Sequence, residues 1–147
     1  MPSIVGTCVF SAKAIEAALA AAWRQAEALG VKVNIALVDS GGNLAGFIRM
    51  PGAFLISIDL SIDKAYCAAG FGLSTRELGV RLMGLPEAVR NGLLRRPRLT
   101  EVPGGVPFLV DGVIAGGIGV SGASDEEDER IAYAGIAAIE VAKRTTT

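Results

Sequence analysis

The stretch from residue 104 to residue 122 constrains the fold more than any other part of the sequence. It holds two apolar runs, residues 106–110 and 113–120, on either side of Asp111-Gly112. Asp-Gly between such runs is a strong hairpin signal, because a type I′ turn needs a positive φ at both central residues. The second run contains three glycines, which weaken a strand. We therefore predict a tight hairpin whose second strand is approached closely by another element, a second subunit or a ligand.

Helical signals occur on both sides of this hairpin. Apolar residues recur every three or four positions after Ser11, which predicts a first helix with serine as its N-cap. Residues 57–69 show the same period. Ser74 with Glu77 three residues later, and the segment that starts at Ser124, are capping boxes that open two further helices. We therefore expect helices before and after the hairpin of residues 104–122.

Strand signals outside that hairpin are shorter. Residues 33–38 and 44–50 flank a glycine turn and predict a second hairpin. A short strand or arm is expected before residue 11, a short strand near residues 99–101, and one or two helical turns over residues 86–94. Hairpins rather than crossovers join the strands, so the sheet should be largely antiparallel and the fold class α+β.

The absence of histidine is the most restrictive fact in the composition. It removes the Ser-His-Asp triad, the Cys–His pair and any zinc or haem site that depends on an imidazole ligand. Acid–base chemistry would then fall to Asp, Glu, Lys, Tyr or Cys. Cys8 and Cys67 are the two cysteines, and their wide spacing indicates neither a zinc site nor a disulfide framework. No metal site is therefore expected.

The charge pattern limits the kinds of partner that we expect for this chain. The net charge is −1, without the basic footprint typical of a nucleic-acid-binding protein. The cluster Arg95-Arg96-Pro97-Arg98 has no interleaved aromatic residue, which favours a solvated loop over a phosphate site. We find no signal-peptide pattern and no apolar run of membrane-spanning length. With 147 residues and no linker, we expect one domain over residues 1–147, in the cytoplasm, with no nucleic-acid or membrane partner.

Two basic side chains are candidates for holding an anionic ligand. Arg49 ends a predicted strand just before Pro51, where its guanidinium could hold a carboxylate bidentately. It could instead form an ion pair with Asp39 or Asp63. Lys64 lies in an otherwise apolar helix, where it could have a lowered pKa and serve as a base or anion anchor. It could instead extend its ammonium group to solvent.

Three further residues complete a predicted pocket. Asp39 begins a glycine turn, where aspartate serves either turn geometry or acid–base chemistry. Gly104-Gly105 precede the hairpin and could present backbone N–H groups to an anion. If the helix with Lys64 packs back across the sheet, Lys64 approaches Arg49, and repulsion between the cations lowers the lysine pKa. We therefore predict a pocket for a carboxylate or phosphate, lined by Arg49, Lys64, Asp39, Gly104 and Gly105.

Several short motifs occur in a family-like order and spacing. In the first half they are Val38-Asp39-x-x-Gly42, Arg49-Met50-x-x-Ala53, Ser57 and Lys64-Ala65. In the second half they are Pro103-Gly104-Gly105-Val106-Pro107, Asp111-Gly112, Gly116-x-Ile118-Gly119-Val120-Ser121-Gly122-Ala123 and Asp128-Glu129. Together they cover residues 11–141, nearly the whole chain, and resemble the GlcG/HbpS-like family, the DUF336 group.

The resemblance implies a profilin-like fold, with an antiparallel sheet of about five strands and packed helices. Family members include the protein of the glycolate-utilisation operon, a secreted haem-binding partner of a redox sensor, and the C-terminal domain of PduO-type corrinoid adenosyltransferases. Others belong to operons for aromatic breakdown, and members tend to form homo-oligomers. Haem or a corrinoid is thus the cofactor that the resemblance implies. Because this chain has no histidine, any haem binding should be weak and not histidine-ligated.

The function hypotheses belong to different classes. The first is an operon-associated protein that binds a small, anionic molecule, acts as a homo-oligomer, and assists the catabolism of an organic acid or aromatic compound. The second is a small cofactor-independent enzyme for a carboxylate-bearing metabolite, with Arg49 as anchor and Lys64 or Asp39 as the acid–base group. The third is a haem- or corrinoid-binding module. A purely structural or assembly module is the fourth.

Overall fold

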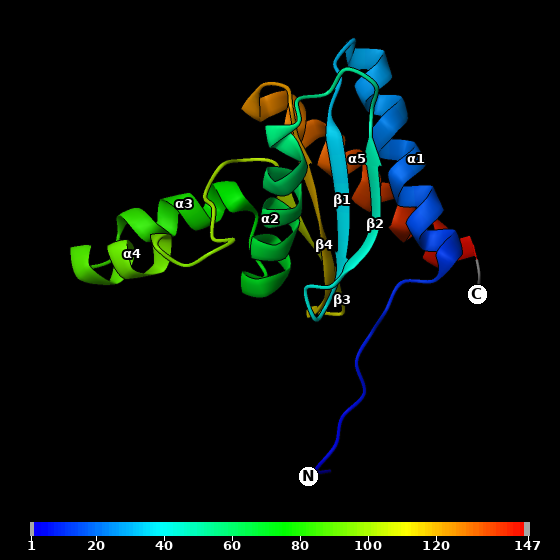
Figure 1. Cartoon of the computed structure of the whole chain (residues 1–147). Helices are drawn as coiled ribbons and strands as arrows, with labels where there is room; N and C mark the ends of the chain where they lie inside the picture. Colours follow the sequence, from blue (N-terminus) through cyan, green and yellow to red (C-terminus); the bar gives the residue numbers. More distant parts are fainter. Residues whose placement is uncertain (1, 146–147) are drawn as a thin grey trace.

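A four-stranded antiparallel sheet lies between two layers of helices (Figure 1). The computed structural model describes residues 2–145, with side chains described up to residue 140. The strand order is β2-β1-β4-β3, where the strands are β1 (Asn34–Asp39), β2 (Leu44–Arg49), β3 (Gly105–Val110) and β4 (Val113–Ser121). The helix α2 (Ile56–Phe71) covers one face, while α1 (Ala12–Leu29) and α5 (Asp125–Thr145) cover the other. The predicted α+β class and antiparallel pairing are confirmed.

Two short helices project from the α2 side of the molecule. They are α3 (Thr75–Met83) and α4 (Glu87–Leu94), and we call this pair the arm (Figure 1). The two turns of α4 agree with the expectation for residues 86–94. No helix among residues 2–145 is long and apolar enough to cross a membrane.

Local signals fixed the helix ends as expected. The Ser11 hydroxyl accepts a hydrogen bond from the Ala14 N–H at 3.1 Å, and the Ser74 hydroxyl accepts one from the Glu77 N–H at 3.1 Å. Ser124 and Glu127 exchange bonds at 3.2 Å in both directions, which is a complete capping box. Each bond satisfies an N–H group that the helix itself leaves free. The predicted caps are therefore confirmed.

The sheet has four strands in the described part of the chain, not the five that the resemblance implied. Residues 2–10 form an N-terminal segment without strand pairing. It contacts the fold through Phe10, whose ring is tilted 43° against that of Phe108 with centroids 5.8 Å apart, and through a hydrogen bond from the Ser40 hydroxyl to the Cys8 carbonyl oxygen at 3.1 Å. The short strand expected at residues 99–101 is also absent there. Its backbone groups bond to side chains instead: the Thr100 N–H donates to the Cys67 sulfur, and the Val102 N–H donates to the Thr100 hydroxyl. Those groups are not free to form a strand ladder.

The glycines of β4 let α2 pack directly against the strand. Asp111 and Gly112 have φ angles of 51° and 77°, as the predicted type I′ turn requires. A Cβ on Gly117 would lie 2.7 Å from the Ala65 carbonyl oxygen of α2, and one on Gly119 would overlap the Ser61 carbonyl oxygen. At these two positions the closely approaching element is therefore a helix of the same chain, rather than a second subunit or a ligand.

The core is asymmetric about the sheet. The layer between the sheet and the helices α1 and α5 holds the large apolar side chains, including Ile35, Leu37 and Ile118 of the strands and Ile131 of α5. The layer between the sheet and α2 is thin, and its buried residues are Ala36, Val38, Ala65 and Ala69. A third small cluster, Cys67, Leu78 and Leu82, lies where α2 meets the arm. The small residues on the α2 face allow the close approach that brings Lys64 of α2 to the end of the sheet.

Candidate functional site

The strand register gathers most of the predicted site at one end of the sheet. Arg49 pairs with Asn34, which in turn pairs with Ser121, so these three residues form one row across β2, β1 and β4. The Gly104 carbonyl oxygen accepts a hydrogen bond from the Val120 N–H at 3.0 Å. Arg49 and Gly104 therefore lie at the end of the sheet where α2 and α5 begin.

Asp39 lies at the other end of the sheet. It pairs with Gly116 at the far end of β1, and the six residues of β1 span about 17 Å at roughly 3.3 Å per residue. Its Oδ1 accepts hydrogen bonds from the N–H groups of Gly41 at 2.9 Å and Asn43 at 3.0 Å. The expectation that Asp39 lines the same pocket as Arg49 is therefore wrong, because its carboxylate organises the β1–β2 turn.

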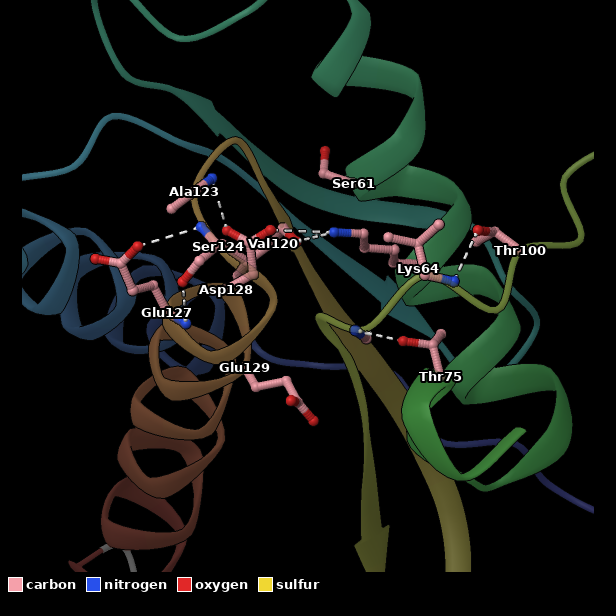
Figure 2. Close-up of polar contacts among 12 residues, drawn as sticks. Ser61, Lys64, Thr75, Thr100, Val120, Ala123, Ser124, Glu127, Asp128 and Glu129 are labelled. Atoms are coloured by element: carbon pink, nitrogen blue, oxygen red, sulfur yellow. Dashed lines mark hydrogen bonds and ion pairs between the residues drawn. The ribbon is translucent and has the colours of Figure 1, made fainter. Parts of the chain in front are cut away.

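Lys64 is the central residue of the candidate site and is 1% exposed. Its ammonium group donates to the Val120 carbonyl oxygen at 2.8 Å and to Asp128 Oδ2 at 3.2 Å (Figure 2). The Lys64 side chain therefore does not extend to solvent, and its ammonium group is not free to anchor an anion. The ammonium group is enclosed and already holds two acceptors.

The two glycines before β3 make room for this lysine. Gly104 has a φ of 126°, and a Cβ there would lie 2.9 Å from the Lys64 Nζ atom. A Cβ on Gly105 would overlap the Lys64 carbonyl oxygen, and the Gly105 N–H donates to the Thr75 hydroxyl at 3.0 Å. The N–H group of Gly105 is thus used within the protein. Close packing around Lys64 explains both glycines without an anion.

Asp128, which lies on α5, is the partner of Lys64 that the sequence analysis did not identify. Its Oδ1 accepts a hydrogen bond from the Ala123 N–H at 3.0 Å, while its Oδ2 faces Lys64 (Figure 2). A signal was present, because Asp128 lies three and four residues before Ile131 and Ala132, on the buried stripe of α5. A buried lysine needs a buried carboxylate.

Burial controls the protonation of this pair. It lowers the pKa of the Lys64 ammonium group, while the nearby acidic groups Asp128, Asp125 and Glu129 oppose that shift. It raises the pKa of Asp128 to about 6, against the opposing effects of Lys64 and two backbone N–H groups. The direction expected for Lys64 is correct, but repulsion from Arg49 is not its cause. The pair connects α2, β4 and α5 across the end of the sheet.

Arg49 serves the loop that leads into α2. It is exposed, and its Nη2 donates to the Ala53 carbonyl oxygen at 3.2 Å. The Asn34 side-chain amide donates to the Phe54 carbonyl oxygen at 3.0 Å, and its Oδ1 has no hydrogen-bond partner among the described residues. Within the described residues Arg49 forms no ion pair with Asp39 or Asp63. Arg49 and Lys64 thus share one end of the sheet, while the Lys64 charge is committed to Asp128.

The described residues bring together no cluster of metal ligands. Across residues 2–140, no three acidic or cysteine side chains come together in a way that could hold a metal ion. The Cys67 thiol donates to the Arg98 carbonyl oxygen at 3.1 Å and accepts from the Thr100 N–H at 3.3 Å. Burial raises its pKa, so the sulfur is a neutral thiol with its hydrogen-bonding positions occupied.

Comparison with known proteins places this arrangement in a family. The family model "Haem degrading protein HbpS-like" matches residues 10–137. Protein GlcG of Escherichia coli K12 is 37% identical over 116 residues, covering 77% of this chain and 81% of GlcG. Corrinoid adenosyltransferase PduO of Salmonella typhimurium is 35% identical over 127 residues, covering 82% of this chain but 36% of PduO. The chain thus spans about a third of the length of that relative.

The fold agrees with the sequence match. A solved structure described as a PduOC–haem complex has a TM-score of 0.80 and 32% identity, covering 88% of this chain and 94% of that one. The family model covers well over half of the chain, and the GlcG match spans most of both proteins. The chain therefore belongs to the HbpS-like family, the GlcG/DUF336 group that its motifs resemble.

Proposed function

We propose that this protein binds a small organic ligand as an accessory protein of catabolism, and is not an enzyme that uses Lys64 or Asp39. The observation that carries this proposal is the buried Lys64–Asp128 pair. A general acid or base must come within hydrogen-bond reach of the proton that it transfers. The side chains of Lys64 and Asp128 are 1% and 4% exposed, and they are bonded to each other.

The second acid–base candidate is also committed. The Asp39 carboxylate accepts hydrogen bonds from two backbone N–H groups of its own turn and lies at the opposite end of the sheet from Arg49. The proposed enzyme would need Arg49 as anchor beside Lys64 or Asp39. Lys64 lies at the same end of the sheet as Arg49 but is enclosed, and Asp39 lies at the opposite end. A substrate held by Arg49 would therefore reach neither group, which favours the binding hypothesis.

Haem is the ligand that the relatives suggest, since one solved relative is described as a haem complex. This chain has no histidine to ligate the haem iron. Cys67 is buried as a neutral thiol, while Met83 is exposed at the end of α3 and Cys8 is exposed before α1. In the described part of the chain, cavities lie between α1 and α5, beside α2 and beside β3, and neither Met83 nor Cys8 lines any of these, whereas Tyr66 and Tyr133 each line one. We expect any haem binding to be weak.

Thermal unfolding of the full chain against a ligand panel tests the proposal. The panel holds haemin, cobalamin and organic acids with and without an aromatic ring. A ligand at a hundredfold excess over its Kd stabilises the folded state by about 2.7 kcal/mol, which a melting curve resolves. We expect at least one organic acid to raise the Tm and to be recovered unaltered by mass spectrometry. Haemin should give no sharp low-spin Soret band at stoichiometric concentration.

Two results would contradict the proposal. One is a panel in which no compound shifts the Tm, which would favour a structural or assembly module. The other is conversion of an organic acid to a product by the parent protein but not by folded Lys64→Met. That loss would show that the buried lysine reaches a substrate after all.

A further inference from the structure

A cavity of about 420 Å³ lies between α2 and the segment of residues 93–99, which begins at the end of α4. Its lining consists of Tyr66, Cys67, Gly70, Phe71, Leu93, Arg96, Pro97 and Leu99. We call the side with Cys67 and Gly70 its floor, and the exposed Arg96 side its rim. The volume falls within the range of roughly 300–1,000 Å³ that is usual for small-molecule sites. The residues come from two segments about 25 positions apart, and neither the buried pair nor Arg49 contributes to it.

The floor of this cavity is open and uncharged. A Cβ on Gly70 would meet no atom within 4 Å, although Gly70 lies inside the helix α2. Cys67 presents a neutral thiol, because burial raises its pKa and both of its hydrogen bonds go to the backbone of residues 98 and 100. An apolar group can therefore rest on this floor without leaving a polar atom unpaired.

The loop at the rim carries arginines, and contacts of Arg98 fix its conformation. Arg98 has a φ of 72°, and its guanidinium lies 3.7 Å from the centre of the Tyr66 ring and 3.6 Å from Asp63 Oδ1. A left-handed conformation is costly for a residue other than glycine, and it persists only where the surroundings enforce it. These contacts, with the Cys67 bond to its carbonyl oxygen, fix the loop that carries Arg96.

Arg96 has no acidic partner among residues 2–140, and neither has its neighbour Arg95, but of these two only Arg96 lines the cavity. Three other arginines on this side of the molecule pair with carboxylates: Arg76 with Glu129, Arg90 with Glu101, and Arg98 with Asp63. A guanidinium is suited to bidentate recognition of a carboxylate. The basic cluster interpreted from the sequence as a solvated loop thus places one uncommitted cation over an apolar cavity.

We propose that this cavity binds an amphipathic organic anion, with a flat apolar body of one or two rings and a single carboxylate. The body lies over Gly70, against Phe71 and Leu99, and the carboxylate bonds to Arg96. This assignment rests on the proposed small-molecule-binding function and names its site and ligand class. A small hydrophilic anion would leave the apolar walls uncovered, and a neutral ring compound would gain no charge-assisted hydrogen bond from Arg96.

The test uses 2-naphthoate as the probe, with its fluorescence anisotropy measured against the full-length protein. Gly70→Leu fills the cavity from its floor, and we expect it to weaken binding by about tenfold or more. Gly92→Leu is the matched control, because Gly92 also lies in a helix, has open space around a Cβ, and is outside the cavity. It should bind like the parent.

The charge is tested separately. Arg96→Gln should weaken 2-naphthoate binding by about tenfold or more, since it removes a charge-assisted hydrogen bond, while Arg95→Gln should have no effect. The neutral analogue 2-naphthamide should bind the parent as weakly as 2-naphthoate binds Arg96→Gln. Circular dichroism of each variant confirms that it is folded, and Arg96 is exposed, so its replacement leaves the core untouched.

The outcomes separate the site from the function. Unchanged binding of 2-naphthoate to Gly70→Leu and Arg96→Gln would overturn the cavity assignment and leave the binding function standing. So would a parent protein that binds haemin or a non-aromatic acid but not 2-naphthoate. If neither 2-naphthoate nor any compound of the thermal panel binds, both proposals are wrong.

Discussion

Replacing Lys64 with methionine removes a charge from the buried pair while keeping a long side chain of similar length. The parent ammonium group has acceptors at 2.8 Å and 3.2 Å, and the pair is enclosed between α2, β4 and α5. In the variant, Asp128 stays buried without its counter-ion. Its Oδ1 keeps the bond from Ala123, but its Oδ2 faces an apolar group.

Removing one partner of a buried ion pair costs about 3–5 kcal/mol, which is a large part of the roughly 5–15 kcal/mol that stabilises a typical domain. For a chain of 147 residues this corresponds to a decrease in Tm of roughly 10–20 °C. Asp128 can relieve part of the cost by taking up a proton. The loss should therefore be largest at pH 8, above the pKa of about 6 that Asp128 has in the parent.

A double-mutant cycle isolates the pair. Unfolding in urea is followed by far-ultraviolet circular dichroism at pH 8 for Lys64→Met, Asp128→Asn and the double variant. Asparagine is uncharged and retains an Oδ1 acceptor for Ala123, so the double variant should be more stable than the sum of the single losses predicts. Lys13→Met, at an exposed lysine, is the control and should change the unfolding free energy by less than about 0.5 kcal/mol.

The reasoning would be refuted by either of two results. One is a loss below about 1 kcal/mol for Lys64→Met at pH 8, which would mean that water or a relaxed loop compensates the Asp128 charge. The other is strict additivity in the cycle, which would mean that the two side chains stabilise the fold independently.

Three further predictions follow from the same structure. The pKa of Asp128 is 3.8 in the unfolded chain and about 6 in the folded one, so the folded state binds this proton more tightly between these pH values. This group therefore makes the unfolding free energy fall as pH rises from 3.8 to about 6, and urea titrations at each pH should show that Asp128→Asn removes the contribution. Gly119→Ala should lower the unfolding free energy by more than about 1–3 kcal/mol, because the new Cβ would overlap the Ser61 carbonyl oxygen. Gly70→Ala, whose Cβ would meet no atom, should raise it by about 0.5–1 kcal/mol, and equal denaturation midpoints of the two variants would contradict this. The exposed apolar side chains of the arm and the family habit lead us to expect a homo-oligomer, so sedimentation at micromolar concentration should show species well above 15.1 kDa, and a monomer alone would refute it.

The parts of this fold that depend on neighbouring residues could be predicted from the sequence. Asp111-Gly112 specified its turn because few residue pairs tolerate two positive φ angles. Ser11, Ser74 and Ser124 specified helix starts because a hydroxyl three residues before a free N–H can bond to it. The glycines of β4 signalled a close neighbour, although nothing in the local sequence identified that neighbour as α2.

The candidate site depended on contacts between distant parts of the chain. Lys64 and Asp128 are 64 residues apart, and their meeting follows from how α2 and α5 pack against opposite faces of one sheet. The strand register placed Arg49 of β2 beside the first residue of β1, whereas Asp39 is the last residue of β1. The two residues that we predicted to line one pocket are therefore at opposite ends of the sheet.

By itself, the sequence determined the turns, the caps, the antiparallel class and the family, because short-range sterics and hydrogen bonds act within a few residues. The tertiary structure alone decided which charges are paired and which stay free. It buried Lys64 against Asp128, used Asp39 in a turn, and left Arg96 at the rim of an apolar cavity. Burial and partnership are properties of packed elements, and these set the chemistry of an ionisable group more strongly than its position in the chain.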